Sequence, residues 1–554
     1  MVALRYAAKF RYGCVAWLNP WKLATILLVA LFLAPVIAIA ITATGDSEGL
    51  WEHLYNTVLP RYVGNTLLLM TGVGCVTLLF GVSTAWIVVR YKFPGRRIFQ
   101  WALLLPAAVP GYLIAYTYTD FLEYAGPLQV LFRDMFGWQS ARDYWFPEIR
   151  SMGGAILVMG SVLYPYVYVM ARTAYLLTPA SLFEIGQICG RSLFWSVALP
   201  LARPAIVAGL ALVLMETVSD FGTVEYFAIE TLTLGIFNVW LGMNNLTAAA
   251  QIAAFTFLLI ILLLVVEILA RARRRFVDTT RRSTSLSPKV VSRWRGMGCG
   301  IICSVPIVLG FIIPVGVLLN FVFQGHSVSL DSAIAKAAWN SLSLGISAAI
   351  LVMITAAFMS LIASFDRSST MRRLTALASF GYAFPGTILA IGVVTAGGAM
   401  DNWIASLLKQ TFGISYEGWL TSGVGLVVFA CVVRFQAVGY GAITTGLGRV
   451  PTSIMEASRV LGKSRSESIY KVMLPMIRLS CVAGGLLVFI DVMKELPMTL
   501  LLRPFNYETL ATYVYQFAKD ELLEEAALPA LAIVISGIVP VILMNLALNK
   551  VRER

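Results

Sequence analysis

Three carboxylates stand within or beside strongly apolar stretches of the sequence. Glu216 and Asp220 lie in METVSDFGTVEYF, and Glu495 lies in DVMKELPMTLLL. Asp220 and Glu495 each follow the proline of a Leu-Pro pair by twenty residues. An ionisable group inside a membrane costs about 2.5–3.5 kcal/mol on insertion scales and usually faces a cavity or a partner. Carboxylates are hard oxygen donors, so all three are candidates to line a path for a charged solute.

The same carboxylates have a second interpretation as gating or salt-bridge residues, because a path that bound its ion tightly would not release it. Asp491 and Lys494 are spaced i, i+3 and can neutralise each other on a helix. Glu216, Asp220 and Glu495 have no adjacent cation in the sequence, which makes them the better path candidates. Both interpretations stay open at this point.

No resident metal site or cofactor is expected on this chain. The sequence has only two histidines, and its seven cysteines are scattered. Cys299 and Cys303 are spaced i, i+4 in an apolar run with no histidine nearby, which favours packed thiols over a zinc site.

Two polar segments share a second pattern, in which a glutamate is followed six residues later by a glycine. The first loop (178–200) contains Glu184 and Gly190, and the second loop (450–475) contains Glu456, Ala457 and Gly462; both end in Leu-Pro. Each predicts two short amphipathic helices joined at the glycine, which suits the left-handed conformation that ends a helix. Such a helix can enter a groove on a soluble partner.

The two loops differ in length. Gly462 precedes Pro475 by thirteen residues, whereas Gly190 precedes Pro200 by only ten. The three missing residues are close to one helical turn. We therefore expect a truncated second helix in the first loop and docking sites that are not equivalent.

Composition places these loops in a membrane protein. Hydrophobic residues make up 59% of the 554 residues and charged residues only 13%, against about 25% charged in soluble domains. We predict an all-α polytopic fold, because about 20 apolar residues cross a bilayer. The sequence has twelve such stretches: 23–43, 65–89, 100–120, 152–172, 204–220, 251–270, 298–323, 339–365, 373–395, 421–440, 477–494 and 528–548.

Charge sets the expected orientation. With the N-terminus inside, all six cytoplasmic segments are rich in Lys or Arg, and the opposite loops are neutral or acidic. Nine of the basic residues lie between Arg271 and Arg295, directly after an apolar span. This placement favours contact with anionic lipid headgroups over nucleic acid, which we do not expect as a partner. Both termini are expected in the cytoplasm, and the first span is expected to remain uncleaved.

The chain repeats itself with an offset of about 275 residues. Asn65-Thr66-Leu67 matches Asn340-Ser341-Leu342, and Pro110-Gly111 in the third span matches Pro385-Gly386 in the ninth. We predict a first six-span module (1–275), a basic connector (276–297) and a second six-span module (298–554). Six spans per module give both copies one orientation. The Pro-Gly pairs should kink or break their helices, either as packing kinks or as gating hinges.

The loops resemble the EAA loops of permease subunits of ATP-binding cassette importers. The match is Glu-Ala-Ser-Arg-Val-Leu-Gly from Glu456 to Gly462, with a weaker copy from Glu184 to Gly190. The segments around Asp220 and Glu495 resemble the fused, two-module permeases of ferric iron importers along essentially the whole chain. The resemblance implies the type I importer fold and docking of the loops on ATPase subunits.

The resemblance also implies the partners and the location. They are two ATPase chains, which use ATP and magnesium, a periplasmic binding protein that delivers ferric iron, and the bacterial inner membrane. Gly462-Lys463-Ser464 looks like the end of a phosphate-binding loop, but that motif needs a glycine where Ala457 stands. No other ATPase signature is present, so the chain is expected to be a transport subunit and not an enzyme.

Three alternatives remain. Related permeases carry thiamine, sulfate, molybdate, polyamines or phosphonate, which only resemblance separates from ferric iron. A twelve-span secondary transporter would need no ATPase, and RYKFPGRR (90–97) is a faint match to a loop of that class. A channel or scaffold fits the spans but gives the paired loops no purpose.

Overall fold

The computed structural model describes residues 20–272, 288–325 and 332–552, apart from residues 367, 417, 449, 451 and 463. The regular structure of the described chain is helical except for the two-residue strands β1 (Tyr91–Lys92) and β2 (Lys289–Val290), and turns and short loops join the helices. Within these described ranges, ten helices are long and apolar enough to span a membrane, and one bent pair, taken as a single span, adds an eleventh. The helix α26 (Leu523–Arg552) covers the position predicted for the twelfth span. The predicted all-α, multi-span architecture is confirmed.

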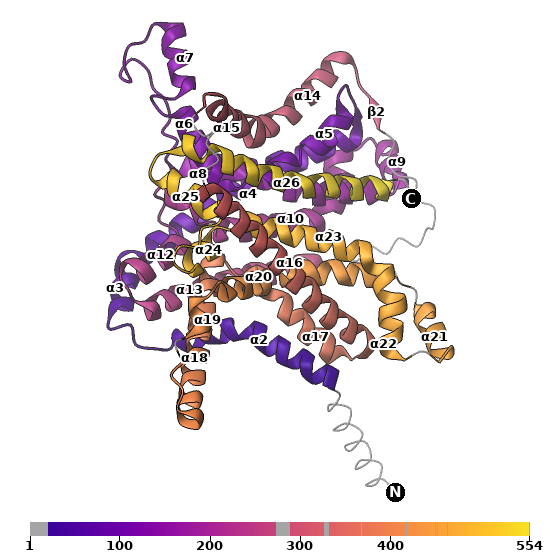
Figure 1. Ribbon diagram of the computed structural model, residues 1–554. Helices are drawn as coiled ribbons and strands as arrows, with labels where there is room; N and C mark the ends of the chain where they lie inside the picture. Colours follow the sequence, from indigo (N-terminus) through magenta and orange to yellow (C-terminus); the bar gives the residue numbers. More distant parts are fainter. Residues whose placement is uncertain are drawn as a thin grey trace. The chain divides into compact units, whose positions relative to one another are not determined.

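The chain forms two compact units, each of which combines segments distant in sequence (Figure 1). Unit 1 contains Met1–Gly45 and Trp339–Tyr507. Its elements are α2 (Pro20–Thr42), most of α16 (Ser332–Asp366), α17 (Ser369–Ala378), η5 (Ser379–Ala383), α18 (Gly386–Phe412), α19 (Trp419–Ser422), α20 (Val424–Leu447), α21 (Thr452–Val460), α22 (Arg465–Ser468), η6 (Ile469–Met473), α23 (Leu474–Met493) and α24 (Pro497–Leu502).

Unit 2 contains Asp46–Ala338 and Glu508–Arg554. Besides β1, β2 and α26, its elements are α3 (Leu50–Thr57), α4 (Leu59–Arg90), α5 (Arg96–Ala102), η1 (Leu105–Ala108), α6 (Gly111–Leu122), α7 (Pro127–Phe136), α8 (Met152–Leu177), α9 (Ala180–Ile188), η2 (Phe194–Ala198), α10 (Leu199–Ser219), α11 (Gly222–Tyr226), α12 (Leu232–Phe237), η3 (Asn238–Gly242), α13 (Leu246–Ala272), α14 (Arg293–Ile307), η4 (Val308–Ile312), α15 (Ile313–Phe323) and α25 (Leu510–Lys519).

Helices from one end of the chain therefore pack with the repeat from the other end. In unit 1 the N-terminal helix α2 packs on α17 and α18. In unit 2 the helix α26 packs on α15 and η1. The sequence modules 1–275 and 298–554 remain a prediction about the repeat, and the compact units cut across them.

A glycine makes the contact between α2 and α18 possible. A Cβ at Gly392 of α18 would overlap the carbonyl oxygen of Pro35 and lie 2.9 Å from Cδ1 of Ile39, both in α2. Small residues let membrane helices approach closely where apolar burial gives no driving force. This close fit explains why the N-terminal span packs against α18 in unit 1.

The third and ninth spans are broken where the Pro-Gly pairs lie. The segments Arg96–Ala108 and Gly111–Phe136 meet at 93°, and α6 begins at Gly111 with Pro110 as its N-cap. In the same way α18 begins at Gly386 with Pro385 as its N-cap. The predicted kinks are confirmed. The ninth span, predicted to end at residue 395, instead continues as helix to Phe412.

Each Leu-Pro pair follows a five-residue π-helical turn, a feature that the sequence pattern does not predict. The turns η2 and η6 lead directly into α10 and α23, which begin with Leu199-Pro200 and Leu474-Pro475. Proline has no backbone N–H, so the ordinary i→i−4 ladder cannot run through it. The wider turn carries the helix past the proline without a break.

The close approach of α18 and α2 predicts a position-specific effect of one methyl group. Gly392→Ala should lower the free energy of unfolding by about 1–3 kcal/mol, the usual cost of overpacking. Gly398→Ala, in the same helix with no atom within 4 Å of the added Cβ, should be neutral or stabilising because alanine favours helix. Thermal unfolding of the purified protein in detergent measures both. Equal effects of the two variants would contradict the packing of α2 on α18.

Candidate functional site

Both loops contain the helix and the glycine that the sequence predicts. The first loop has α9 followed by Gly190, with a φ of +65°, and the second has α21 followed by Gly462, with a φ of +75°. Glycine adopts this left-handed conformation without the steric cost that a Cβ brings. The predicted role of the two glycines as helix terminators is confirmed.

The structure also shows where the shorter loop lost its residues. After Gly462 the chain forms α22 and then η6, whereas after Gly190 it enters η2 almost at once. The described part of the first loop therefore has no counterpart of α22. The predicted truncation of the second short helix is confirmed.

Different contacts hold the two loops. In the first loop, buried Phe183 packs against Trp86 with 6.1 Å between ring centroids. A Cβ at Gly186 would lie 2.8 Å from Cγ2 of Val197, so α9 folds closely onto η2. In the second loop, the buried hydroxyls of Ser458 and Ser468 form a 2.6 Å hydrogen bond that joins α21 to α22. Each loop is thus tied to the helix that follows it.

The loops expose large apolar side chains to their surroundings. Ile188 is 84% exposed and Trp195 68% in the first loop, and Val460 is 87% exposed and Tyr470 75% in the second. Trp195 and Tyr470 are both the second residue of a π turn. Glu184 is exposed on α9. Exposed apolar side chains at matching positions are typical of an interaction surface.

Asp220 acts as a helix cap at the end of α10. Its Oδ1 accepts hydrogen bonds from the backbone N–H groups of Thr223 (3.0 Å) and Val224 (3.2 Å), and its Oδ2 accepts one from the Thr223 hydroxyl (3.0 Å). These bonds satisfy the first N–H groups of α11, which would otherwise lack acceptors. Asp220 forms no ion pair with any of the described residues.

Glu495 caps the equivalent short helix and also has a cation. Its Oε1 accepts the backbone N–H of Met498 (3.2 Å) and lies 3.3 Å from Nη1 of Arg434, on α20. Both side chains are buried. Glu495 has no cation next to it in the sequence, because its partner in the fold is 61 residues away. The signal that could have found it is an arginine inside the apolar run of the tenth span.

The two carboxylates lie at equivalent places, as their common distance from Leu-Pro predicts. A Cβ at Gly111 would lie 3.5 Å from Oδ2 of Asp220, and one at Gly386 would lie 2.9 Å from Oε1 of Glu495. Each carboxylate thus abuts the glycine where the third or ninth span restarts. In both repeats the long helix after the loop ends at the break in another span.

The remaining sequence candidates are less well defined by contacts. Glu216 is half-buried on α10. Lys494 and Asp491 form the predicted local pair, with 2.8 Å between Nζ and Oδ1. Among the described residues, no three His, Cys, Asp or Glu side chains come together as a metal site requires.

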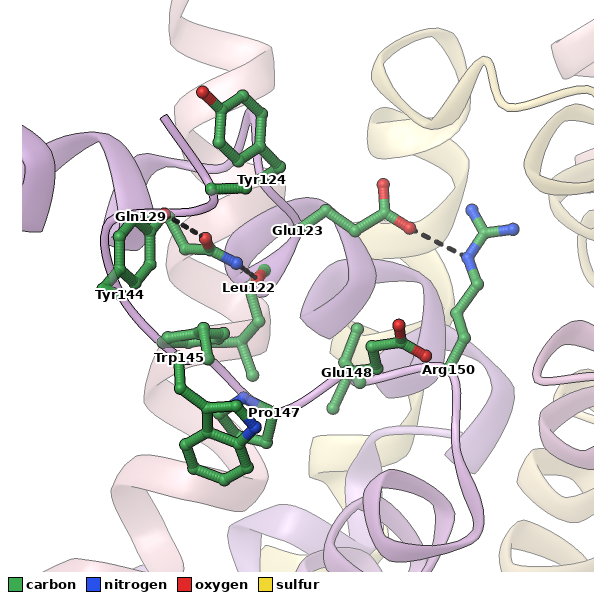
Figure 2. A pocket seen from close by; sticks show the side chains of 12 residues that line it. Leu122, Glu123, Tyr124, Gln129, Tyr144, Trp145, Pro147, Glu148 and Arg150 are labelled. Atoms are coloured by element: carbon green, nitrogen blue, oxygen red, sulfur yellow. Dashed lines mark hydrogen bonds and ion pairs between the residues drawn. The ribbon is translucent and has the colours of Figure 1, made fainter. Parts of the chain in front are cut away.

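A hollow in unit 2 was not predicted. It has a volume of about 480 Å³ and lies between the end of α6 and the segment before α8, with Tyr144, Trp145 and Glu148 along its wall (Figure 2). At its edge Arg150 pairs with Glu123 (2.9 Å) and Glu521 (3.1 Å). Burial alone would lower the pKa of Arg150, but the phenol of Tyr226 and the two carboxylates raise it.

The buried pair predicts strong asymmetry between single and double substitutions. Arg434→Met should lower the free energy of unfolding by about 3–5 kcal/mol, because it leaves a buried carboxylate without its cation. Adding Glu495→Gln should recover much of the loss. Lys494→Met, which breaks the partly exposed pair with Asp491, should cost about 0–1 kcal/mol. Thermal unfolding in detergent compares them, and a double variant as unstable as Arg434→Met would refute the pairing.

Comparison with known proteins covers both repeats. The family described as "Binding-protein-dependent transport system inner membrane component" matches residues 77–278 and 357–554. The chain is 25% identical to the Fe(3+)-transport system permease protein FbpB 2 of Haemophilus influenzae over 540 residues, which cover 95% of this chain and 98% of the relative. It is 20% identical to the ferric transport system permease protein FbpB of Actinobacillus pleuropneumoniae over 543 residues, 90% of this chain and 73% of the relative.

Another relative matches about one repeat. The probable sulfate transport system permease protein cysT of Chlorokybus atmophyticus is 30% identical over 217 residues, 38% of this chain and 71% of the relative. Because the family matches two separate segments that together make up more than half of the chain, this protein belongs to the inner-membrane components of binding-protein-dependent transport systems and carries the family's domain twice.

Proposed function

We propose that this chain is the permease subunit of an ATP-binding cassette importer that moves ferric iron across the bacterial inner membrane. A periplasmic binding protein delivers the iron, and two separate ATPase chains dock on the two loops. One observation supports ferric iron as the cargo: the two relatives described above that match 95% and 90% of this chain are named for ferric transport. The sulfate relative matches only 38% of the chain.

The long helices after the loops give the proposal a mechanical basis. The continuous helices Phe194–Ser219 and Ile469–Met493 have 26 and 25 residues, or about 38 Å each at the α-helical rise. Each begins at a loop and ends beside the carboxylate that abuts a broken span. A movement of the loop by an ATPase would therefore reach the Pro-Gly break through one rigid element. This is a physical route for alternating access.

Charge favours a cationic cargo over sulfate or molybdate. Asp220 forms no ion pair among the described residues, and carboxylates suit a hard trication. An oxyanion beside the same carboxylate would be repelled. Glu495 is neutralised by Arg434, so we assign it to holding the break and leave Asp220 and Glu216 as path candidates. The cytoplasmic location of both termini follows from the Lys and Arg placement.

Transport in vesicles tests the cargo. The full chain is reconstituted in vesicles with its ATPase and its binding protein. It should take up radioactive iron only when ATP is present on the side of the membrane where the ATPase binds, and vanadate should stop uptake. A sulfate or molybdate excess should not compete. Competition by either oxyanion would overturn the cargo, and uptake driven by an ion gradient without ATP would overturn the importer class.

The difference between the loops predicts unequal substitutions. Glu456→Lys should abolish uptake and Glu184→Lys should reduce it less, since only the second loop has α22 as additional docking surface. Gly462→Pro should also abolish uptake, because proline cannot adopt the positive φ of that residue. Glu52→Lys, at an exposed position on α3, is the control for insertion and expression.

Uptake and co-purification of the ATPase are measured for each variant. Equal loss of uptake in Glu184→Lys and Glu456→Lys would remove the proposed asymmetry. Unchanged co-purification and uptake in Gly462→Pro would contradict the docking role of the second loop.

A further inference from the structure

A two-stranded parallel ladder joins two basic segments that are far apart in sequence. In β1 and β2, Tyr91 pairs with Lys289 and Lys92 pairs with Val290. A Cβ at Gly296 of α14 would lie 3.3 Å from Cδ of Pro94 and 3.5 Å from Cβ of Phe93, so the contact continues past the ladder. The start of α14 therefore lies against the segment that links α4 to α5, within unit 2.

The ladder brings two segments together that contain several basic residues and no acidic ones. Residues 88–100 and 288–300 contain no Asp or Glu. The side chains of Lys92, Arg97, Lys289, Arg293 and Arg295 are all exposed. None of them forms an ion pair with another described residue. We call these five residues the basic patch.

Arg96, between two of these positions, has a different role. Its Nε donates a 2.6 Å hydrogen bond to the carbonyl oxygen of Val88, near the end of α4. It closes the end of that helix, so we do not include it in the patch. The Arg96 side chain is therefore engaged within the fold, whereas the five exposed cations of the patch remain available to a ligand.

Large apolar side chains flank the basic patch. Trp294 is 81% exposed, Ile98 59% and Met297 50%. The ladder directly follows α4 and directly precedes the spanning segment Arg293–Phe323. The patch therefore lies at the level where two spans leave the apolar part of the bilayer. Exposed cations beside exposed tryptophan at this level match the chemistry of lipid headgroups above acyl chains.

We propose that the basic patch, with Trp294, binds the phosphodiester headgroups of anionic lipids such as phosphatidylglycerol. Five exposed cations at the membrane surface attract such headgroups, and each contributes about a fivefold gain in affinity. The lipid fixes the end of α4 and the start of α14 to the surface through one shared ligand. This anchor depends neither on the cargo nor on the ATPase.

Photo-crosslinking tests the proposal with the full chain in lipid nanodiscs. A photoactivatable phosphatidylglycerol should label residues 88–100 and 288–300 at least fivefold more than a matched phosphatidylcholine probe. Replacement of all five patch residues by Gln should remove this preference. A variant that keeps the charges, with Lys and Arg exchanged at the five positions, should retain it.

Two controls distinguish a lipid site from a general effect of charge and from a site for a free anion. Arg372→Gln with Arg373→Gln removes two exposed cations from α17 and should leave labelling of the patch unchanged. Inorganic phosphate at the same ionic strength as a chloride control should not displace the lipid probe. Displacement by phosphate would overturn the lipid in favour of a free anion, and equal labelling by both lipid probes would overturn the site altogether.

Discussion

The structure depends on how the free backbone N–H and carbonyl groups of the broken helices find hydrogen-bond partners where no water can reach them. In a membrane every free backbone N–H or carbonyl needs a protein partner. The third and ninth spans break at Pro110 and Pro385, and short helices follow α10 and α23. Asp220 and Glu495 supply acceptors to those short helices and lie against Gly111 and Gly386. A carboxylate at this position thus has a structural role as a helix cap, whatever the cargo is.

The capped break also stands at one end of each long helix. One of the two loops lies at one end and a broken span at the other, with a π turn at the Leu-Pro pair between the loop and the α-helix. Because the turn keeps the helix continuous past Pro200 and Pro475, we expect a displacement of a loop to be transmitted along the helix instead of being taken up at the proline. At the break, Pro110 and Pro385 have no backbone N–H to donate, so the hydrogen-bond ladder of the span is interrupted there.

Local patterns in the sequence predicted much of this arrangement. Apolar length predicted the spans, and fixed spacing from Leu-Pro predicted that Asp220 and Glu495 are equivalent. The conformations of Gly190 and Gly462 followed from their place after an amphipathic run. These features depend on residues within about twenty positions of one another, where periodicity and turn chemistry are informative.

Long-range features were not predictable in the same way. The pairing of Arg434 with Glu495, the seat of α2 on Gly392 and the ladder between β1 and β2 each join segments distant in sequence. Hydropathy describes how apolar a segment is and not which partner it meets. The extension of α18 to Phe412 was missed for a related reason. The predicted span ends at residue 395, before Asp401, whose carboxylate accepts hydrogen bonds from Tyr416 and Thr421, 15 and 20 residues away, and is satisfied inside the fold.

The repeats have also diverged in a consistent direction. The second has the longer loop with α22, and a buried ion pair between Arg434 and Glu495 lies against Gly386 of its break. The first has a shorter loop, and Asp220, which lies against Gly111 of its break, accepts hydrogen bonds from Thr223 and Val224 and forms no ion pair with the described residues. A buried ion pair resists separation because each charge left alone is costly, and the hydrogen bonds that a carboxylate such as Asp220 accepts are charge-assisted as well. The carboxylates beside the two breaks are therefore held by different contacts, so the two breaks need not move together.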